Sequence, residues 1–409
     1  MRMLKKTVFF AVILVIASIA LKLWFVFTYG RGQEVLSYLS DSGYEITGNL
    51  LKGEGYNMTY LSSKPLYSFR PPLYPLFLFV IFSFFGKNIL LLRVIYIGIV
   101  TFIAYFTYLI GKRVFNNTVG AIASLAVLFY PPLIFYVVWT GPEAISTLIL
   151  TATVFLIVST SGWSNLKLVF LGLMFSLLMY SQSNLAGLAP ILIVYSILTL
   201  KKERWKKAAI ILFSTALFLS PWIARNFIIH KKLVFTSGTG LAFASANNPD
   251  VLSKGSGDYY YAPFITEAQS LSELERDRYL MRKGLEFIAR SPLEYAKLSM
   301  LRFWRIWRPY FQLVDDGRNL FRKRDQIILF CIETPLLLFF LLGILFAHKK
   351  KEKKLWLFYA IFAYFTIAGT LMRAKVSYRF LYSPLIIVIA SFGLIESYRR
   401  VKALRNKNA

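Results

Sequence analysis

Hydrophobic residues in this 409-residue chain gather into long runs instead of alternating with polar residues. A run of about 20 apolar residues matches the hydrocarbon thickness of a bilayer and predicts a membrane-spanning helix. The pattern therefore predicts an all-α polytopic membrane protein, a bundle of about ten transmembrane helices. The predicted spans are 7–29, 88–111, 117–138, 142–160, 166–183, 185–200, 207–224, 326–347, 355–371 and 379–397.

Short basic clusters at the ends of these runs indicate their direction across the membrane. They lie at Lys112–Arg113, 201–207, 348–354 and from Arg399 to Lys407. Cytoplasmic loops carry such an excess of lysine and arginine. We therefore expect a cell membrane protein with both termini in the cytoplasm and its active site on the outer face. The basic start of the chain and the long first run predict an uncleaved first span rather than a signal peptide.

This topology divides the chain into three parts. Residues 1–225 form an N-terminal membrane module that includes a first outer loop at 30–87. Residues 226–325 form a second outer loop, and residues 326–409 form the C-terminal transmembrane helices with a basic cytoplasmic tail. Long ordered loops on one face usually carry function.

Each outer loop contains a segment predicted to lie along the membrane surface. Leu73–Phe85 is strongly apolar but too short to span, and it follows two prolines. Pro292–Arg308 mixes aromatic and apolar bulk with four charges, Lys297, Arg302, Arg305 and Arg308. This is the composition of an interfacial amphipathic helix, although a helix packed on the outside of the bundle has the same composition.

Overall composition excludes some classes of partner. The chain is 57% hydrophobic with a formal net charge of +28, but its basic residues do not form one stripe, which argues against nucleic acid. The single Cys331 excludes an intrachain disulfide and a multi-cysteine metal site. No cofactor is expected. A divalent metal is not indicated, because His230 and His348 are far apart in the chain, but Asp315–Asp316 leave that question open.

The first outer loop carries the best candidate for a catalytic acid or base. Asp41 lies just beyond the first span, and Tyr44 follows it closely. A carboxylate near the bilayer surface can accept a proton from an attacking hydroxyl, whereas an aspartate at this position can also cap a helix.

Five cations on the predicted outer side are candidates for binding a phosphate. Arg70 precedes Pro71–Pro72, so its guanidinium stands at a stiff corner. The others are Arg225 after the seventh span and Arg373, Lys375 and Arg379 in the last outer turn. Cations on a short outer loop run against the positive-inside tendency. They therefore suggest either a phosphate site or contact with lipid headgroups.

Two carboxylates lie where a charge is costly. Glu143 is at the outer end of the fourth predicted span, and Glu333 is inside the eighth. Such groups orient a substrate or satisfy a neighbouring helix. Glu143 can act on an acceptor or form an ion pair with Arg70 or Arg225.

Taken together, these motifs resemble the GT-C membrane glycosyltransferases. More closely, they are similar to the bacterial and archaeal relatives of protein O-mannosyltransferases and to the lipid A aminoarabinose transferase. The motifs run nearly end to end. They are Asp41, Tyr44 and Gly53–Tyr56; Arg70–Pro75; Gly86 and Arg93; Tyr108–Gly120; Tyr130–Pro132 and Glu143; Pro221–Asn226; Tyr378–Phe380 and Pro384.

The resemblance implies a GT-C-like fold and inverting transfer of a sugar from a polyprenyl-phosphate donor to a lipid, glycan or protein acceptor. Asp41 matches the acidic residue that acts at the acceptor in that family. Family members often carry an Asp-Glu pair, and Ser42 here argues against protein O-mannosylation. Two alternatives remain: an oligosaccharide ligase or polymerase using a pyrophosphate carrier, and a lipid-sugar transporter or flippase. No inverted repeat is evident to support transport.

Overall fold

The computed structural model describes most of the chain. The described residues are 2–29, 42–59, 61–159, 163–200, 202–253, 260, 262–310, 314–315, 318–319, 323–349, 354–373 and 377–408. Two of the predicted site residues, Asp41 and Lys375, lie outside them.

Every predicted span is occupied by helix, which confirms the all-helical membrane architecture. The helices are α1 (Arg2–Tyr29), α5 (Ile89–Val114), α6 (Asn117–Leu128) with α7 (Pro131–Trp139), α8 (Pro142–Ser159), α9 (Asn165–Ser181), α10 (Ser183–Thr199), α11 (Arg204–His230), α17 (Lys323–Lys349), α18 (Leu355–Leu371) and α19 (Ser377–Asn408).

Not all of these helices have the full length of a membrane span. Among the described residues, five are long and apolar enough by length and composition, and α6 with α7 makes a sixth if the bent pair is one span. Helices α9, α10 and α18 are equally apolar but have 17 residues each. At 1.5 Å per residue they measure roughly 25 Å, a little less than a typical hydrocarbon core.

The predicted third span is broken by two prolines. Helices α6 and α7 meet at an angle of 45°. Pro131 and Pro132 have no N–H, so the carbonyl of Leu128 has no intrahelical partner. Ser18 Oγ and Lys22 Nζ of α1 donate to that carbonyl instead, at 3.0 and 2.9 Å. Helix α1 is thereby attached to the break.

Glycines permit two close helix crossings. A Cβ atom at Gly111 of α5 would lie 2.7 Å from Gly120 Cα of α6. In α17 and α19, Cβ atoms at Gly343 and Gly393 would lie within 2.2 Å of backbone carbonyls of the opposite helix. Small residues let membrane helices approach in this way, so these positions hold the first and last parts of the chain in tight bundles.

The two outer loops are rich in helix. The first contains α3 (Ser42–Leu51) and α4 (Leu73–Phe85), so the helix predicted at 73–85 is present. The second contains more helices than the sequence indicated, together with one antiparallel strand pair. They are α12 (Thr239–Ala246), α13 (Asp250–Ser253), α14 (Pro263–Glu267), the 3-10 turn η2 (Ala268–Ser270), α15 (Glu273–Arg290), α16 (Pro292–Trp307), β1 (Val314–Asp315) and β2 (Arg318–Asn319).

Helix α16 occupies the predicted amphipathic segment, but two of the four charges predicted for its polar face, Arg302 and Arg308, are buried. Arg302 is 1% exposed, and its guanidinium donates to Asn247 Oδ1 at 3.1 Å and to the Ala246 carbonyl. The placement of Arg302 among the surface charges was wrong because the carbonyls at the end of α12 attract the cation inward. Met300 and Trp304 are on the exposed side, at 76% and 56% exposure.

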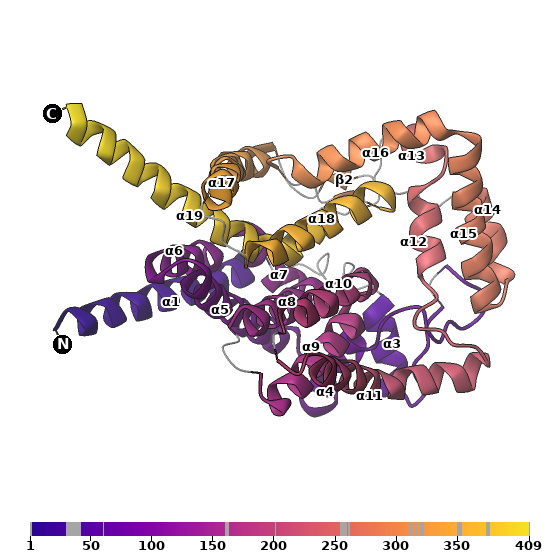
Figure 1. Ribbon diagram of the computed structural model, residues 1–409. Helices are drawn as coiled ribbons and strands as arrows, with labels where there is room; N and C mark the ends of the chain where they lie inside the picture. The colour runs from indigo at the N-terminus through magenta and orange to yellow at the C-terminus, as the bar shows by residue number, and fades with distance from the viewer. Residues whose placement is uncertain are drawn as a thin grey trace.

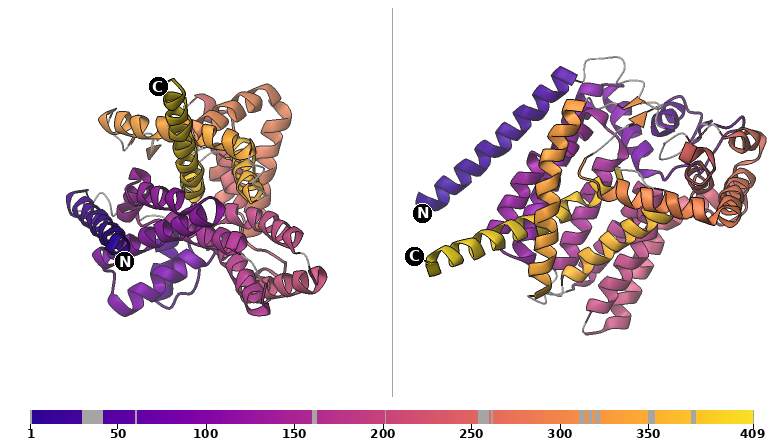
Figure 2. Two further views of the ribbon diagram at one scale, coloured as in Figure 1. Left: turned by 60° about the vertical axis from the view of Figure 1, so that its left-hand side comes forward. Right: turned by 90° about the horizontal axis from the view of Figure 1, so that it is seen from above.

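The two outer loops share one apolar core of their own. Ile46 and Met58 of the first loop pack in one cluster with Trp222 of α11 and Leu241 and Leu280 of the second loop. Helices α12–α16 lie at the opposite side of the molecule from the two chain termini (Figure 1). A second direction of view agrees (Figure 2, right).

Two of the basic clusters lie together. Lys354 Nζ donates to the Arg113 carbonyl at 3.0 Å, and the Arg113 guanidinium lies 3.4 Å from the Ser159 carbonyl. Two helix ends that the charge pattern assigns to the cytoplasm are therefore neighbours, although which side of a membrane they face stays a prediction.

Candidate active site

Helix α3 presents the start of the candidate site. It begins at Ser42, directly after Asp41, and packs on α4. Thr47 Oγ1 donates to the Pro75 carbonyl at 3.1 Å, and a Cβ at Gly43 would lie 2.7 Å from the Tyr74 ring. The close contact of the two short helices fixes Ser42. The role of Asp41 stays a prediction.

Arg70 lies beside the start of α3. Its Nε donates to Ser42 Oγ at 2.6 Å, while its side chain is exposed and its guanidinium carbon lies 5.3 Å from the centre of the Phe69 ring. Tyr56 OH donates to the carbonyls of Arg70 and Pro71 at 3.0 and 3.1 Å. Burial raises the pKa of Tyr56, so this hydroxyl stays protonated and keeps donating. The hydroxyl of Tyr56 therefore holds the backbone at the corner that carries Arg70.

Tyr44 connects the same region to the turn before α8. Its hydroxyl lies 3.1 Å from Thr140 Oγ1, and Tyr74 OH donates to the Thr140 carbonyl at 2.7 Å. Thr140 has a positive φ of 46°, which turns the chain sharply between α7 and α8. Glu143, half-buried in the first turn of α8, follows this turn. Tyr44 and the segment of Glu143 are thus neighbours across the site.

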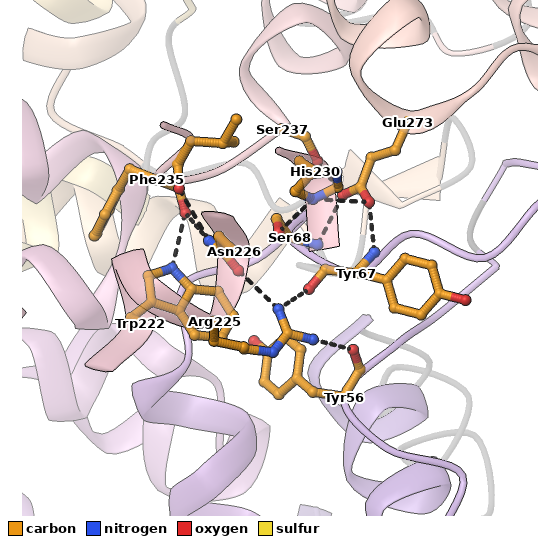
Figure 3. Close-up of polar contacts among 11 residues, drawn as sticks. Tyr56, Tyr67, Ser68, Trp222, Arg225, Asn226, His230, Phe235, Ser237 and Glu273 are labelled. Carbon is orange, nitrogen blue, oxygen red and sulfur yellow. Dashed lines mark hydrogen bonds and ion pairs between the residues drawn. The ribbon is translucent and has the colours of Figure 1, made fainter. Parts of the chain in front are cut away.

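Arg225 holds the first outer loop against α11. It donates to the carbonyls of Tyr67 and Tyr56 at 2.7 and 2.8 Å, and to Asn226 Oδ1 at 2.7 Å (Figure 3). Its guanidinium carbon lies 5.1 and 4.8 Å from the centres of the Tyr56 and Trp222 rings. Through these contacts Arg225 stabilises the packing of the first outer loop on α11. That Arg225 binds a phosphate stays a prediction.

Glu333 and Arg379 form an ion pair in the interior. Arg379 NH2 lies 2.9 Å from Glu333 Oε2, and the two side chains are 2% and 1% exposed. Arg379 NH1 also donates to the carbonyls of Ile306 and Arg308 at 3.0 and 2.9 Å, and Tyr130 OH donates to Glu333 at 2.5 Å. The pair joins α17 and α19 to the end of α16. A role for either residue in binding substrate stays a prediction.

Arg373 lies apart from this ion pair. Its guanidinium donates to Tyr260 OH and lies 5.4 Å from the centre of the Tyr260 ring, on the side of the second outer loop. The cations of the last outer turn therefore have different surroundings. Among the described arginines predicted to bind phosphate, Arg70 is exposed, Arg225 and Arg373 are partly accessible, and Arg379 is buried.

Comparisons with known proteins bear on this arrangement. Residues 69–224 match the family model of dolichyl-phosphate-mannose-protein mannosyltransferases. The fold is similar to the oligosaccharyltransferase AglB from Archaeoglobus fulgidus. Its complex with an inhibitory peptide and a dolichol-phosphate matches with a TM-score of 0.56 and 13% identity over 98% of this chain and 52% of that chain. The chain has the GT-C fold. The predicted resemblance is confirmed at this level.

Other comparisons add less. The apo form of the same oligosaccharyltransferase matches with a TM-score of 0.54 and 14% identity over 97% of this chain and 51% of that chain. This GT-C chain therefore spans about half the length of those structures. ArnT from Cupriavidus metallidurans bound to undecaprenyl phosphate overlaps with a TM-score of 0.38 and 13% identity over 85% of this chain and 71% of that chain, too low to carry an argument. No curated protein matches by sequence.

The GT-C chain also contains a polar cluster that the sequence analysis missed. Glu273 at the start of α15 contacts His230, Ser237 and the backbone of Tyr67 and Ser68 (Figure 3). The Ser272–Glu275 capping box marks this helix start in the sequence. Nothing in that motif indicates that Glu273 turns toward a loop more than two hundred residues away.

No metal site is evident among the described parts of the chain. They contain no group of three or more histidine, cysteine, aspartate or glutamate side chains placed to hold an ion. Asp41 lies outside those parts, so the expectation that no metal is required stays a prediction.

Proposed function

We propose that this protein is a glycosyltransferase that moves a sugar from a polyprenyl-monophosphate carrier to an acceptor on the non-cytoplasmic face of the cell membrane. The observation that carries the proposal is the contact between Arg70 and Ser42. It brings an exposed guanidinium, suited to a phosphate, next to the residue that follows Asp41. We assign phosphate binding to Arg70 and the role of the base to Asp41, the sequence neighbour of Ser42.

The proposed reaction is a single displacement. Asp41 accepts the proton of an acceptor hydroxyl or amine, and the freed electron pair attacks the anomeric carbon. The bond between that carbon and the phosphate oxygen breaks, and the lipid phosphate leaves with the electron pair. Attack opposite the leaving group inverts the configuration of the sugar.

Fixed cations stabilise the charge that develops on the leaving phosphate. Arg70 contacts Ser42, which follows Asp41 in the sequence, and Arg373 and Lys375 belong to the last outer turn of the predicted topology. Two arginines can neutralise a lipid phosphate, so the proposal requires no divalent metal. We assign the orientation of the acceptor to Tyr44, whose hydroxyl lies 3.1 Å from Thr140 Oγ1, and to Glu143 in the first turn of α8.

The surroundings support a lipid-linked donor. The matched family acts on dolichyl-phosphate-mannose, and the AglB structure holds a dolichol-phosphate. Helices α4 and α16 expose apolar side chains such as Val80 and Trp304, 53% and 56% accessible. Such faces suit the acyl boundary and would wall the site against water. We propose that the acceptor is a lipid, a glycan or a protein. We also propose that both termini of the chain lie in the cytoplasm.

The decisive experiment offers radiolabelled polyprenyl-monophosphate sugars to purified protein in lipid. Asp41→Asn is expected to slow transfer about 100-fold to 10,000-fold, the usual contribution of a general base. Glu54→Gln is the matched control, because Glu54 is an exposed carboxylate of the same loop and should leave the rate unchanged. A correctly folded Asp41→Asn protein with full activity would refute the base assignment.

One alternative has its own support. The similarity to an oligosaccharyltransferase favours a ligase that moves a whole oligosaccharide from a pyrophosphate carrier. Analogues of the two carriers separate the hypotheses. Inhibition by the monophosphate analogue alone supports our proposal, and inhibition by the pyrophosphate analogue alone supports the ligase. A folded wild-type protein that turns over neither donor would favour transport.

A further inference from the structure

Glu273 is a buried carboxylate with an unusual set of partners. It occupies the first position of α15 and is 7% exposed. Its Oε2 accepts the backbone N–H of Tyr67 at 2.6 Å, and its Oε1 accepts that of Ser68 at 2.7 Å (Figure 3). Ser237 Oγ donates to Oε1 as well. Glu273 thus binds the backbone of the first outer loop from the second.

The buried carboxylate of Glu273 depends on the N–H and O–H groups that donate to it. Burying a carboxylate is costly unless hydrogen bonds replace its water. Bonds to a charged group are also stronger than neutral ones. The positions of Tyr67 and Ser68 relative to α15 are therefore tightly determined.

Two arginines hold the same loop from other directions. Arg225 of α11 donates to the Tyr67 carbonyl, so that residue is bound at its N–H by Glu273 and at its carbonyl by Arg225. Arg276, one turn along α15 from Glu273, donates to the Leu61 carbonyl at 2.6 Å, and its guanidinium carbon lies 5.9 Å from the centre of the Phe69 ring. The loop is thus fixed on both sides of the segment that leads to Arg70.

The cluster of Ser68, His230 and Glu273 is not a nucleophilic triad. Such a triad needs the two ring nitrogens of the histidine to face different partners. Here His230 Nε2 lies 2.9 Å from Ser68 Oγ and 3.6 Å from Glu273 Oε2, so one nitrogen faces both. Ser68 is also fully buried. The cluster holds the loop and has no exposed nucleophile.

Arg70 follows directly from the residues that Glu273 binds. Phe69 alone separates Ser68 from Arg70, and Pro71 and Pro72 stiffen the chain on the other side. The place of the Arg70 guanidinium beside Ser42 therefore depends on the place of Ser68. We infer that Glu273 is a positioning residue, which sets Arg70 for the transfer reaction by binding the backbone of Tyr67 and Ser68. This inference rests on the proposed function.

Glu273→Gln and Glu273→Ala test it. Both variants remove charge-assisted bonds, so the amides of Tyr67 and Ser68 should exchange hydrogen about tenfold faster or more. The Leu66 amide, bonded to the Met58 carbonyl at 2.7 Å, is the internal reference. Glu286→Gln is the matched control, because Glu286 lies on α15 and pairs with Arg282 and Lys283 of the same helix, which are 67% and 34% accessible.

Kinetics supply the second readout. If Arg70 is displaced, the kcat of transfer should fall about 10-fold to 100-fold in Glu273→Ala, because a shift of about 1 Å can cost that much. The KM for the acceptor should stay within about twofold of the wild-type value, since the loss is in orientation. Glu273→Gln, which keeps an accepting oxygen, should recover part of the rate. Glu286→Gln should behave as wild type.

The outcomes separate this inference from the function on which it rests. Faster exchange at Tyr67 and Ser68 with a lower kcat supports it. Wild-type rates in Glu273→Ala would overturn it while leaving the proposed function intact. If the wild-type protein transfers no sugar, the proposed function fails, and the link between Glu273 and catalysis fails with it. Unchanged hydrogen exchange at Tyr67 and Ser68 in the Glu273 variants would refute the claim that Glu273 holds the loop, whatever the result for transfer.

Discussion

Replacing Arg379 by leucine removes the cation from a carboxylate that is almost completely buried. Glu333 is 1% exposed and would keep only the hydrogen bond from Tyr130. The carbonyls of Ile306 and Arg308 would lose their donor at the same time. Removing one partner of a buried pair usually costs about 3–5 kcal/mol of stability. We expect a loss in that range, and a similar loss for Glu333→Leu, which removes the carboxylate that lies 2.9 Å from Arg379.

The double variant should be more stable than either single one. With both residues replaced by leucine, neither charge of this pair remains in the interior, and such replacements are often close to neutral. The two carbonyls still lack a donor, which costs roughly 2 kcal/mol. The loss for the double variant should therefore be well below the sum of the two single losses.

Reversible unfolding in mixed micelles measures the three free energies. The exposed pair of Lys206 and Glu203, 3.8 Å apart at the start of α11, is the matched control, and breaking it should cost less than about 1 kcal/mol. Single losses that add up in the double variant would refute the reasoning, because they would show that the two charges do not depend on each other.

Four further results are expected. Arg70→Ala should lower the kcat of transfer at least as much as Glu273→Ala and raise the KM for the donor about tenfold, and Arg70→Lys should recover part of both, which steady-state kinetics will show. Burial raises the pKa of the Asp277 carboxyl from 3.8 to about 6, so its ionisation should lower stability as pH rises from about 4 through 6. Asp277→Asn should remove this decline of roughly 3 kcal/mol at most, visible in thermal midpoints between pH 4 and 8. The Ser63 amide lies 3.0 Å from the Gln269 carbonyl. Cysteines at these two positions, in a protein whose native cysteine has been replaced, should therefore form a disulfide on oxidation. Mass spectrometry measures whether the disulfide forms, and its absence would contradict the contact. Lipids brominated near the headgroup should quench Trp304, and equal quenching of a Trp304→Phe protein would contradict the surface position of α16.

Much of the fold could be predicted because a membrane span leaves a strong local pattern. Length and hydropathy located every span, and the apolar segment after Pro71–Pro72 is a helix over Leu73–Phe85 as expected. The second outer loop was harder, because its helices bury small faces against one another and against the first loop. Arg302 shows what the pattern could not predict. The sequence pattern assigned Arg302 to the charges on the helix surface, but in the structure its guanidinium donates to Asn247 and Ala246 at the end of α12.

The candidate site could be predicted as residue types but not as contacts. The sequence pointed to Arg70 as a stiffly presented cation, yet its bond to Ser42 depends on how α3 and α4 pack. Glu273 was missed because it lies in an ordinary helix-start motif and its partners are backbone amides, which leave no mark in the sequence. Glu333 stood out in an apolar run, but its partner Arg379 could not be identified from spacing alone.

The attachment of α1 to the proline break has a consequence for how the protein is made. Lys22 is completely buried, and its acceptor, the Leu128 carbonyl, lies 106 residues further along the chain. During synthesis the lysine enters the membrane before this partner exists, at a cost of about 2.5–3.5 kcal/mol near the bilayer centre. We therefore expect the first helix to remain shallow or shielded by the insertion machinery until α6 and α7 arrive. Nascent chains stalled before Leu128 should leave Lys22 open to amine-reactive reagents, and chains stalled well after α7 should protect it. The two prolines thus set a point during translation before which the N-terminal helix cannot reach its final depth.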